Sequence, residues 1–298
     1  MEEYRTFGVE LDDGVATTLL QKLDEADAVL VGLGAGYSAG AGLDYFDTKT
    51  FQEYCPEMVR LGYHCDYELV GMRDENWSRG RKWAYTATHI NYVRNVFPVA
   101  KAYTDLLALL SGKDYFVVTS NCDRQIMRAG FPADRFFEIQ GNYDDFGCSA
   151  RCGVPSWDNH DDIQRALAGI DHESFECREE TIPKCPVCGA DARLCFRHSG
   201  HWDEDNARYQ RFIEEHSTGK LLLLEMGVGL STPGVIRTPF QRLTTNLEGA
   251  FLVRVILAYE GQPVFNWAGK IPESLAGKSL SVNADACKLV TALLSMRE

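Results

Sequence analysis

The sequence lacks a long apolar run, an excess of basic residues and any internal repeat, and these absences exclude several classes of protein. No apolar stretch approaches the ~20 residues that cross a bilayer as a helix, so we expect no membrane partner. Acidic residues outnumber basic ones by 43 to 30, which gives a net charge of -13. Because nucleic-acid binding needs clustered Lys and Arg to neutralise phosphates, we expect no nucleic-acid partner either.

The chain also begins without the basic and apolar segments of a secretory signal, so we expect a cytoplasmic protein. Ten cysteines in a long chain of this kind favour free thiols or metal ligands over disulfides. With 298 residues, 45% of them hydrophobic, the chain is long enough for one large core and a smaller second domain.

Four short, mostly aliphatic runs are predicted as buried strands of a parallel sheet, at residues 28–32, 115–119, 221–225 and 250–256. Helical patterns lie between and after them. One, from Val99 to Ser111, has apolar residues at three-to-four spacing before Gly112 ends it, and another covers 284–294. The alternation predicts an α/β fold with a doubly wound, Rossmann-like parallel sheet.

Two segments interrupt this alternation, and we expect them to form a smaller lobe. Residues 51–95 are rich in aromatic and charged residues and are predicted as a helical insertion. Residues 148–216 hold six of the ten cysteines and are predicted as a zinc-ribbon-like insertion. The Rossmann domain is then built from 1–50, 96–147 and 217–298.

A glycine-rich segment, Val31-Gly-Leu-Gly-Ala-Gly-Tyr-Ser-Ala-Gly-Ala-Gly-Leu43, follows the first predicted strand. Glycines at such a place let the backbone approach a pyrophosphate, whose charge a helix N-terminus stabilises. Tight strand-to-helix turns need glycine whatever they bind, so this segment alone does not decide between a cofactor loop and an ordinary turn.

Polar residues follow the second predicted strand, where ligands bind in open α/β sheets. Asn121 and Asp123 lie there, in Val118-Thr-Ser-Asn-Cys-Asp-Arg-Gln-Ile-Met-Arg-Ala-Gly130. An isolated Asn-x-Asp usually caps the following helix, and only the accompanying motifs favour a ligand-binding role here.

Two pairs of cysteines predict a structural zinc site. Cys185-Pro-Val-Cys188-Gly has the form of a zinc knuckle, whereas Cys148 and Cys152 have three residues between them and lie far from it in sequence. Cys177 or Cys195 is therefore an alternative ligand, and buried or free thiols are an alternative for the whole set.

In their order along the chain, these motifs resemble those of the sirtuin family. The family has a GAGxSxxxGxxxF loop, a TxNxDxxxxRAG strand end, an E-[LI]-x-G-[SN] turn, a two-pair zinc module, a Gly-x-x-L segment and a late Asn, and all six occur here in that order. The resemblance runs from about Ala28 to the C-terminus and implies a Rossmann domain that binds NAD.

By position, the resemblance implies that Asn121 and Asp123 hold the nicotinamide and its ribose, and that both act in catalysis together with Gln140. The implied contacts to the NAD phosphates are Gly34, Ala35, Gly36 and Ser38, and those to the adenosine half are Gly227, Gly229 and Asn266. The remaining implied cofactor contacts are Leu43, Asp44, Tyr45, Ser120, Val228 and Ala286.

Gln140 differs from the sirtuin pattern at the position where deacylating members have a histidine. In deacylating sirtuins the residue before this glycine is the histidine general base, and a neutral amide cannot take up that proton. Cleavage of the glycosidic bond does not itself need the base, so ADP-ribosyl transfer survives the substitution. The loop Leu43-Asp-Tyr-Phe-Asp47 also lacks the arginine of the family's Asp-Phe-Arg.

Gly-Leu-Asp-Tyr in the loop, Gln140 and Asn266-Trp-Ala-Gly together resemble the class M sirtuins of microbes, which are encoded with macrodomain proteins. The resemblance implies an NAD-dependent protein ADP-ribosyltransferase, a lipoylated carrier like the glycine-cleavage H protein as acceptor, and a functional link to a macrodomain ADP-ribosyl hydrolase. The alternatives are an NAD-dependent deacylase with another base, an NAD hydrolase, and a catalytically silent NAD-sensing module.

The seven histidines are scattered, and each is predicted as a surface or capping residue rather than a base. His198 and His201 follow the zinc region and are weaker candidates for a catalytic role. Trp77, Trp83 and Tyr85 fit an aromatic wall for the acceptor as well as the core of the helical insertion.

Overall fold

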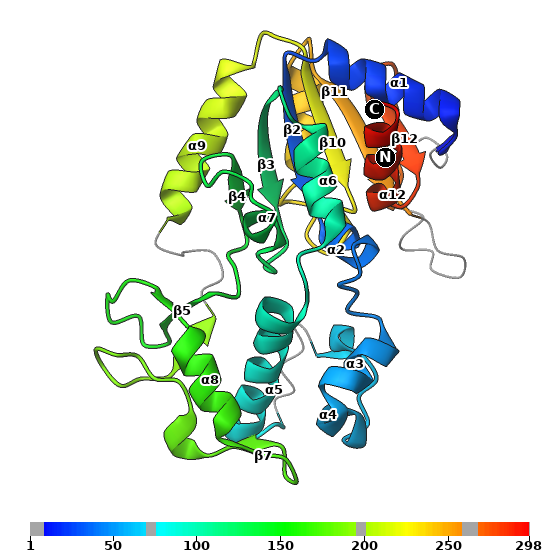
Figure 1. Cartoon of the computed structure of the whole chain (residues 1–298). Coiled ribbons are helices and arrows are strands. Elements are labelled where there is room, and N and C mark those ends of the chain that lie inside the picture. The colour runs from blue at the N-terminus through cyan, green and yellow to red at the C-terminus, as the bar shows by residue number, and fades with distance from the viewer. Residues whose placement is uncertain (1–8, 70–75, 195–200, 258–267, 298) are drawn as a thin grey trace. The chain divides into compact units, whose positions relative to one another are not determined.

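The structure is a computed structural model of the whole chain, and it describes residues 9–69, 76–194, 201–257 and 268–297 (Figure 1). The chain divides into two compact units. The larger unit comprises Met1–Gly42, Val99–Gln140 and His201–Glu298, and the smaller unit comprises Leu43–Pro98 and Gly141–Gly200. Among the described residues, no helix is both long enough and apolar enough to cross a membrane.

The larger unit is built on a seven-stranded parallel sheet with the order β1-β12-β11-β10-β2-β3-β4. This confirms the predicted α/β fold, and the four predicted strands correspond to β2, β3, β10 and β11. Aliphatic side chains fill both faces of these strands because helices cover both sides. The strands are β1 (Val9–Glu10), β2 (Ala28–Leu33), β3 (Asp114–Thr119), β4 (Phe136–Glu138), β10 (Leu221–Met226), β11 (Phe251–Ile256) and β12 (Ser279–Asn283).

Helices pack on the two faces of this sheet (Figure 1). On one face, α12 (Ala286–Ser295) packs against α1 (Asp13–Glu25), α2 (Ala35–Gly40) and α6 (Lys101–Leu109). On the other, α9 (Trp202–Glu215) and α10 (Arg237–Asn246) contribute Tyr209, Phe212 and Phe240 to a core that includes Leu30 and Phe116 of the strands. Helix α9 falls within 148–216, the range predicted as the cysteine-rich insertion, yet its apolar face packs in the larger unit.

The strand order places a topological switch point between β2 and β10. The chain runs outward from β2 to β3 and β4, and later returns to β10 beside β2 before continuing to β11 and β12. Connections on the two sides of such a point diverge and leave a crevice at the carboxyl ends of the strands, where α/β proteins bind ligands.

The smaller unit combines helices with short antiparallel strands. Its three-stranded sheet has the order β6-β5-β9, and β7 pairs with β8. Trp77, Trp83 and Tyr85 are buried, which fits the core interpretation of these aromatic residues. The helices are α3 (Thr48–Tyr54), α4 (Pro56–Arg60), η1 (Asp66–Glu68), α5 (Arg79–Asn91), η2 (Tyr92–Val96), α8 (His160–Ala168) and η3 (Glu179–Thr181); the strands are β5 (Asp145–Cys148), β6 (Trp157–Asp158), β7 (Ile170–Asp171), β8 (Glu176–Cys177) and β9 (Ala192–Leu194).

Candidate functional site

The glycine-rich loop after β2 packs directly on the loop after β10, at the switch point of the sheet. The N–H of Gly36 donates to Gly227 O at 2.9 Å, and the N–H of Gly34 donates to Met226 O at 3.0 Å. A Cβ on Gly34 would lie 2.5 Å from Gly227 O, and one on Gly36 would lie 2.9 Å from the same atom. Glycine is needed at both positions because two backbones touch there.

These contacts give the two glycines a structural role. Their N–H groups donate to Met226 O and Gly227 O, so these two groups are not free donors for a phosphate, and the contact of the loop with NAD stays a prediction. Gly227 has a φ of +63°, and its α-carbon faces Gly36 and the backbone nitrogen of Tyr37. By contrast, a Cβ on Gly229 would meet no atom within 4 Å.

A buried polar network joins α2, the turn after β3 and α6. The hydroxyl of Ser38 donates to Asp123 Oδ2 at 2.5 Å, and the Asn121 side-chain amide donates to Ser38 Oγ at 2.9 Å and to Gly34 O at 3.1 Å. The hydroxyl of Tyr103 lies 2.8 Å from Ser38 Oγ. Since Ser38 donates to Asp123, Tyr103 donates to Ser38, and the chain of hydrogen bonds ends on the carboxylate.

This network fixes Asn121 in one orientation. Both amide hydrogens of Asn121 have acceptors inside the larger unit, while its amide oxygen has no partner among the described residues. Its backbone N–H donates to Thr119 Oγ1 at 3.1 Å, which holds the turn after β3. The arrangement presents a preorganised acceptor at the carboxyl edge of the sheet.

Asp123 is deeply buried, and its carboxylate is occupied by protein donors. Besides Ser38, the backbone N–H of Gln125 donates to Asp123 Oδ1 at 3.0 Å. Burial raises the pKa of Asp123, although these hydrogen bonds oppose the shift. The carboxylate is therefore placed to orient Ser38, and through it Asn121.

Gln140 lies in the turn after β4, at the same edge of the sheet as Asn121. Thr119 pairs with Glu138 in the β3–β4 register, and Ile139 N–H donates to Thr119 O at 3.0 Å. The turns that carry Asn121 and Gln140 therefore leave neighbouring strands at the same level. The side chain of Gln140 is partly exposed, which leaves it accessible to a ligand.

The other predicted cofactor residues are divided between the two units. Ser120 follows β3, with its N–H bonded to Leu33 O, and Ala286 begins α12 after its N-cap Asp285. Val228 is buried and its carbonyl accepts from Arg237. Leu43, Asp44 and Tyr45 belong to the smaller unit, where Asp44 Oδ1 accepts from Phe46 N–H. Asn266, Cys195 and His198 lie outside the described residues.

The four predicted zinc ligands form one cluster in the smaller unit. Cys148 Sγ lies 3.5 Å from Cys188 Sγ, Cys152 Sγ lies 3.6 Å from Cys185 Sγ, and all four sulfurs lie within 4.8 Å of one another. Tetrahedral zinc with Zn–S bonds of about 2.3 Å separates its sulfurs by about 3.8 Å, so the cluster fits a zinc ion. The alternative ligand Cys177 is buried elsewhere, with its thiol 3.5 Å from Ala166 O.

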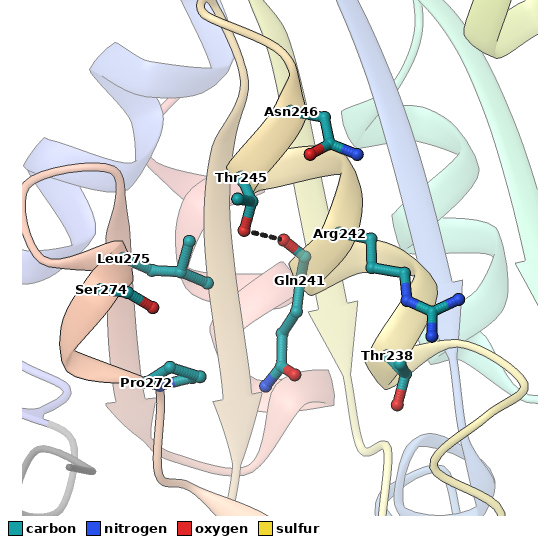
Figure 2. Close-up of a pocket in the computed structure, with 8 residues that line it drawn as sticks. All are labelled: Thr238, Gln241, Arg242, Thr245, Asn246, Pro272, Ser274 and Leu275. Atoms are coloured by element: carbon teal, nitrogen blue, oxygen red, sulfur yellow. Dashed lines mark hydrogen bonds between the residues drawn. The ribbon is translucent and has the colours of Figure 1, made fainter. Parts of the chain in front are cut away.

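A polar pocket of about 200 Å³ lies apart from these residues, along α10 in the larger unit (Figure 2). None of the predicted site residues lines it, and Arg242 supplies its cationic side chain. Its lining residues are Thr238, Gln241, Arg242, Thr245, Asn246, Pro272, Ser274 and Leu275.

Tyr103 is the site residue that the sequence did not single out. It occupies an apolar position of the predicted helix 99–111, and its ring packs edge-to-face on Tyr37 at 5.0 Å between centroids. Its hydroxyl enters the network only because α6 packs close to α2. Nothing in the local spacing distinguishes it from a core residue.

The chain matches no described protein-family profile. It is 29% identical over 289 residues to a protein ADP-ribosyltransferase of Staphylococcus aureus, covering 94% of this chain and 87% of that protein. It is also 33% identical over 249 residues to a probable bifunctional ADP-ribose hydrolase/ADP-ribosyltransferase of Fusarium oxysporum f. sp. cubense. That match covers 78% of this chain and 41% of the fungal protein.

Solved structures share the fold at low sequence identity. A Sir2 homologue in complex with NAD aligns with a TM-score of 0.57 at 17% identity, over 98% of this chain and 96% of that one. A Sir2 protein with a deacetylated peptide and 3'-O-acetyl-ADP-ribose also aligns with a TM-score of 0.57, at 19% identity, over 94% of this chain and 97% of that one. The chain therefore has the sirtuin fold and is a sequence relative of protein ADP-ribosyltransferases.

Proposed function

We propose that this chain is an NAD-dependent protein ADP-ribosyltransferase of the sirtuin type, which releases nicotinamide and modifies an acceptor protein. The observation that carries the proposal is the neutral Gln140 at the same sheet edge as Asn121, where deacylating sirtuins have their histidine base. The similarity to the staphylococcal ADP-ribosyltransferase over 94% of this chain supports the same activity.

In this proposal NAD occupies the crevice at the β2–β10 switch point. The close contacts of Gly34 and Gly36 with Gly227 hold the loops after β2 and β10 together. The solved NAD complex of a Sir2 homologue with the same fold supports the assignment of NAD as cofactor. Zinc at the cysteine cluster has a structural role, because four thiolates leave it no open coordination position.

Transfer breaks the bond between ribose C1' and the nicotinamide nitrogen, and nicotinamide leaves as a neutral molecule. The acceptor atom then bonds to C1'. The fixed amide oxygen of Asn121 accepts a hydrogen bond from the cofactor, and its preorganisation avoids reorientation during reaction. Gln140 hydrogen-bonds and orients the ribose, whereas Asp123 acts as a positioning residue through Ser38.

We also propose the finer assignment to the class M sirtuins, with a lipoylated, H-protein-like carrier as acceptor. A functional link to a macrodomain ADP-ribosyl hydrolase belongs to the same proposal. The fungal relative supports this link, because the name of that protein combines ADP-ribose hydrolase and ADP-ribosyltransferase.

Incubation with NAD labelled in its adenosine half, in the presence of purified lipoylated H protein, separates the candidate activities. We expect labelled protein and free nicotinamide. Free ADP-ribose alone would indicate a hydrolase, acyl-ADP-ribose from an acylated peptide would indicate a deacylase, and tight NAD binding without nicotinamide release would favour the sensing module. Only labelled protein together with free nicotinamide supports transfer.

Two variants serve as controls for this assay. Asn121→Ala removes the fixed amide and is expected to abolish nicotinamide release. Met127→Ala, at an exposed position on the short helix α7 (Gln125–Arg128), leaves the network intact and should behave as the wild type. Equal loss in both variants would argue that the effect of Asn121→Ala is not specific to the site.

A further inference from the structure

Arg124 is a non-glycine residue with a left-handed backbone, and it lies three residues after Asn121 in the turn after β3. Its φ is +60° and its ψ is +11°, and it is the N-cap of the short helix α7. This conformation is sterically disfavoured for an L-residue and is freely adopted only by glycine. Residues held in such conformations cluster at functional sites, where the surrounding structure determines them.

The guanidinium of Arg124 forms an ion pair with Glu138, the last residue of β4. Arg124 Nη1 donates to Glu138 Oε2 at 2.5 Å, and the two side chains are 21% and 6% exposed. Burial raises the pKa of the Cys122 thiol, and the charge of Glu138 raises it further, so Glu138 lies close to the turn after β3. Since Glu138 stands two residues before Gln140, the ion pair connects the turn after β3 with the turn after β4.

The turn that carries Gln140 leaves a short strand, because β4 has three residues and lies at the edge of the sheet (Figure 1). Its last residue, Glu138, pairs with Thr119, and Ile139 N–H donates to Thr119 O at 3.0 Å. The indole N–H of Trp202 on α9 donates to Ile139 O, also at 3.0 Å. The ion pair therefore adds a side-chain connection at the point where the paired strands end.

A second ion pair joins the same two strands at their amino ends and provides a comparison. Arg135 directly precedes β4 and pairs with Asp114, the first residue of β3. These side chains are 41% and 44% exposed, and exposed ion pairs contribute little to stability. The Arg124–Glu138 pair differs in its burial, in the left-handed backbone of its arginine and in its position at the carboxyl edge of the sheet.

From these contacts we infer that Arg124 and Glu138 are positioning residues for the proposed transfer, and that their ion pair fixes the separation between the Asn121 and Gln140 side chains. The inference rests on the proposed function and deepens it. Asn121 is already oriented by the hydrogen bonds of its own amide. The ion pair therefore determines where Gln140 lies relative to that amide.

The expected effect is on the rate of the chemical step rather than on the affinity for NAD. In the proposal the phosphates and the adenosine half of NAD lie along the loops after β2 and β10, whereas the ion pair joins the turns after β3 and β4. Displacement of a reacting group by about 1 Å can lower a rate by about 100-fold. Loss of the ion pair should therefore lower kcat and leave the Kd for NAD unchanged.

The test measures nicotinamide release from NAD by the full-length protein, with lipoylated H protein as acceptor and NAD at saturation. Titration with NAD measures the Kd and the number of NAD molecules bound per chain. Arg124→Gln and Glu138→Gln should each lower kcat about 10- to 100-fold. Both should bind NAD with the Kd and stoichiometry of the wild type, whereas a merely structural role would reduce the number of molecules that bind.

Two further variants separate the ion pair from folding and from backbone strain. The double variant Arg124→Gln/Glu138→Gln contains no unpaired buried charge, and its kcat should fall no further than that of either single variant, because both residues act through one contact. Arg124→Gly removes the same guanidinium but adopts the left-handed backbone freely. It should melt at a higher temperature than Arg124→Gln and show the same low kcat.

Arg135→Gln is the matched control, because it breaks the exposed ion pair at the other end of the same strands and should keep the wild-type kcat. The inference is overturned if Arg124→Gln or the double variant keeps the wild-type kcat, or if Arg135→Gln loses as much. A kcat that falls only in proportion to the number of NAD molecules bound also overturns it. If the wild type itself releases no nicotinamide, the proposed function fails, which is distinguishable because it depends on no variant.

Discussion

Substitution of Gly227 by alanine is expected to destabilise the larger unit strongly, because the loop after β10 has no room for a side chain. Gly227 has a φ of +63°, and the added Cβ would lie 2.2 Å from Tyr37 N and 2.5 Å from Gly36 C. Both neighbours are backbone atoms of the loop after β2, so no side-chain rotation can relieve the overlap.

The magnitude follows from two contributions. A left-handed conformation costs an L-residue about 1–2 kcal/mol. Displacement of a packed backbone to admit an extra methyl group adds about 1–3 kcal/mol. Together they amount to about 3 kcal/mol, which lowers the melting temperature of a unit of this size by roughly 6–12 °C.

Gly229→Ala provides a matched control two residues further along the same loop. A Cβ there would meet no atom within 4 Å, so stability should stay within about 0.5 kcal/mol of the wild type. Thermal melts followed by circular dichroism measure both variants under identical conditions. The reasoning is refuted if Gly227→Ala melts within about 1–2 °C of the wild type, the shift expected for about 0.5 kcal/mol, or if the two variants fall equally.

Three further predictions concern groups elsewhere in the two units. Cys188→Ser should release zinc, measured as the metal-to-protein ratio, whereas Cys177→Ser should retain it because that thiol lies against Ala166 O. Glu225→Ala should cost about 3–5 kcal/mol in a urea melt, because it leaves the fully buried Arg254 guanidinium without the carboxylate that it contacts at 2.6 and 2.9 Å. The pKa of Asp66 in the folded protein lies below its unfolded value of 3.8, so the ionised carboxylate stabilises the fold above pH 3.8. This stabilisation is lost as the pH falls through the folded pKa. Asp66→Asn should remove this acid sensitivity from the melting temperature measured against pH.

The central strands were predictable because each is a short aliphatic run with both faces covered. Residues 28–32, 115–119, 221–225 and 250–256 each match a strand of the sheet to within one residue at either end. The edge of the sheet was not predictable in the same way. Strands β1 and β4 have two and three residues, and β12 (Ser279–Asn283) mixes serines with apolar residues, so no run distinguishes them from loops.

The candidate site was predictable only where its residues are adjacent in sequence. The Cys-x-x-Cys pair indicated the cysteine cluster, and the strand-end motif indicated Asn121 and Asp123. The hydrogen bonds from the Asn121 amide to Gly34 and Ser38 join residues 87 and 83 positions apart, and no local pattern distinguishes Tyr103 from a core residue. The assignment of Gly34 and Gly36 to the NAD phosphates stays a prediction, and the structure adds a requirement that no local pattern indicates, because a second backbone leaves no room for a Cβ at either position.

His89 also shows what the sequence alone could not predict, because it was expected at the surface and is buried. His89 is buried because Asp66, whose Oδ1 lies 3.1 Å from His89 Nδ1, gives its ring a polar partner 23 residues earlier in the chain and on another element. Sequence spacing therefore favoured a surface position, and burial reversed it.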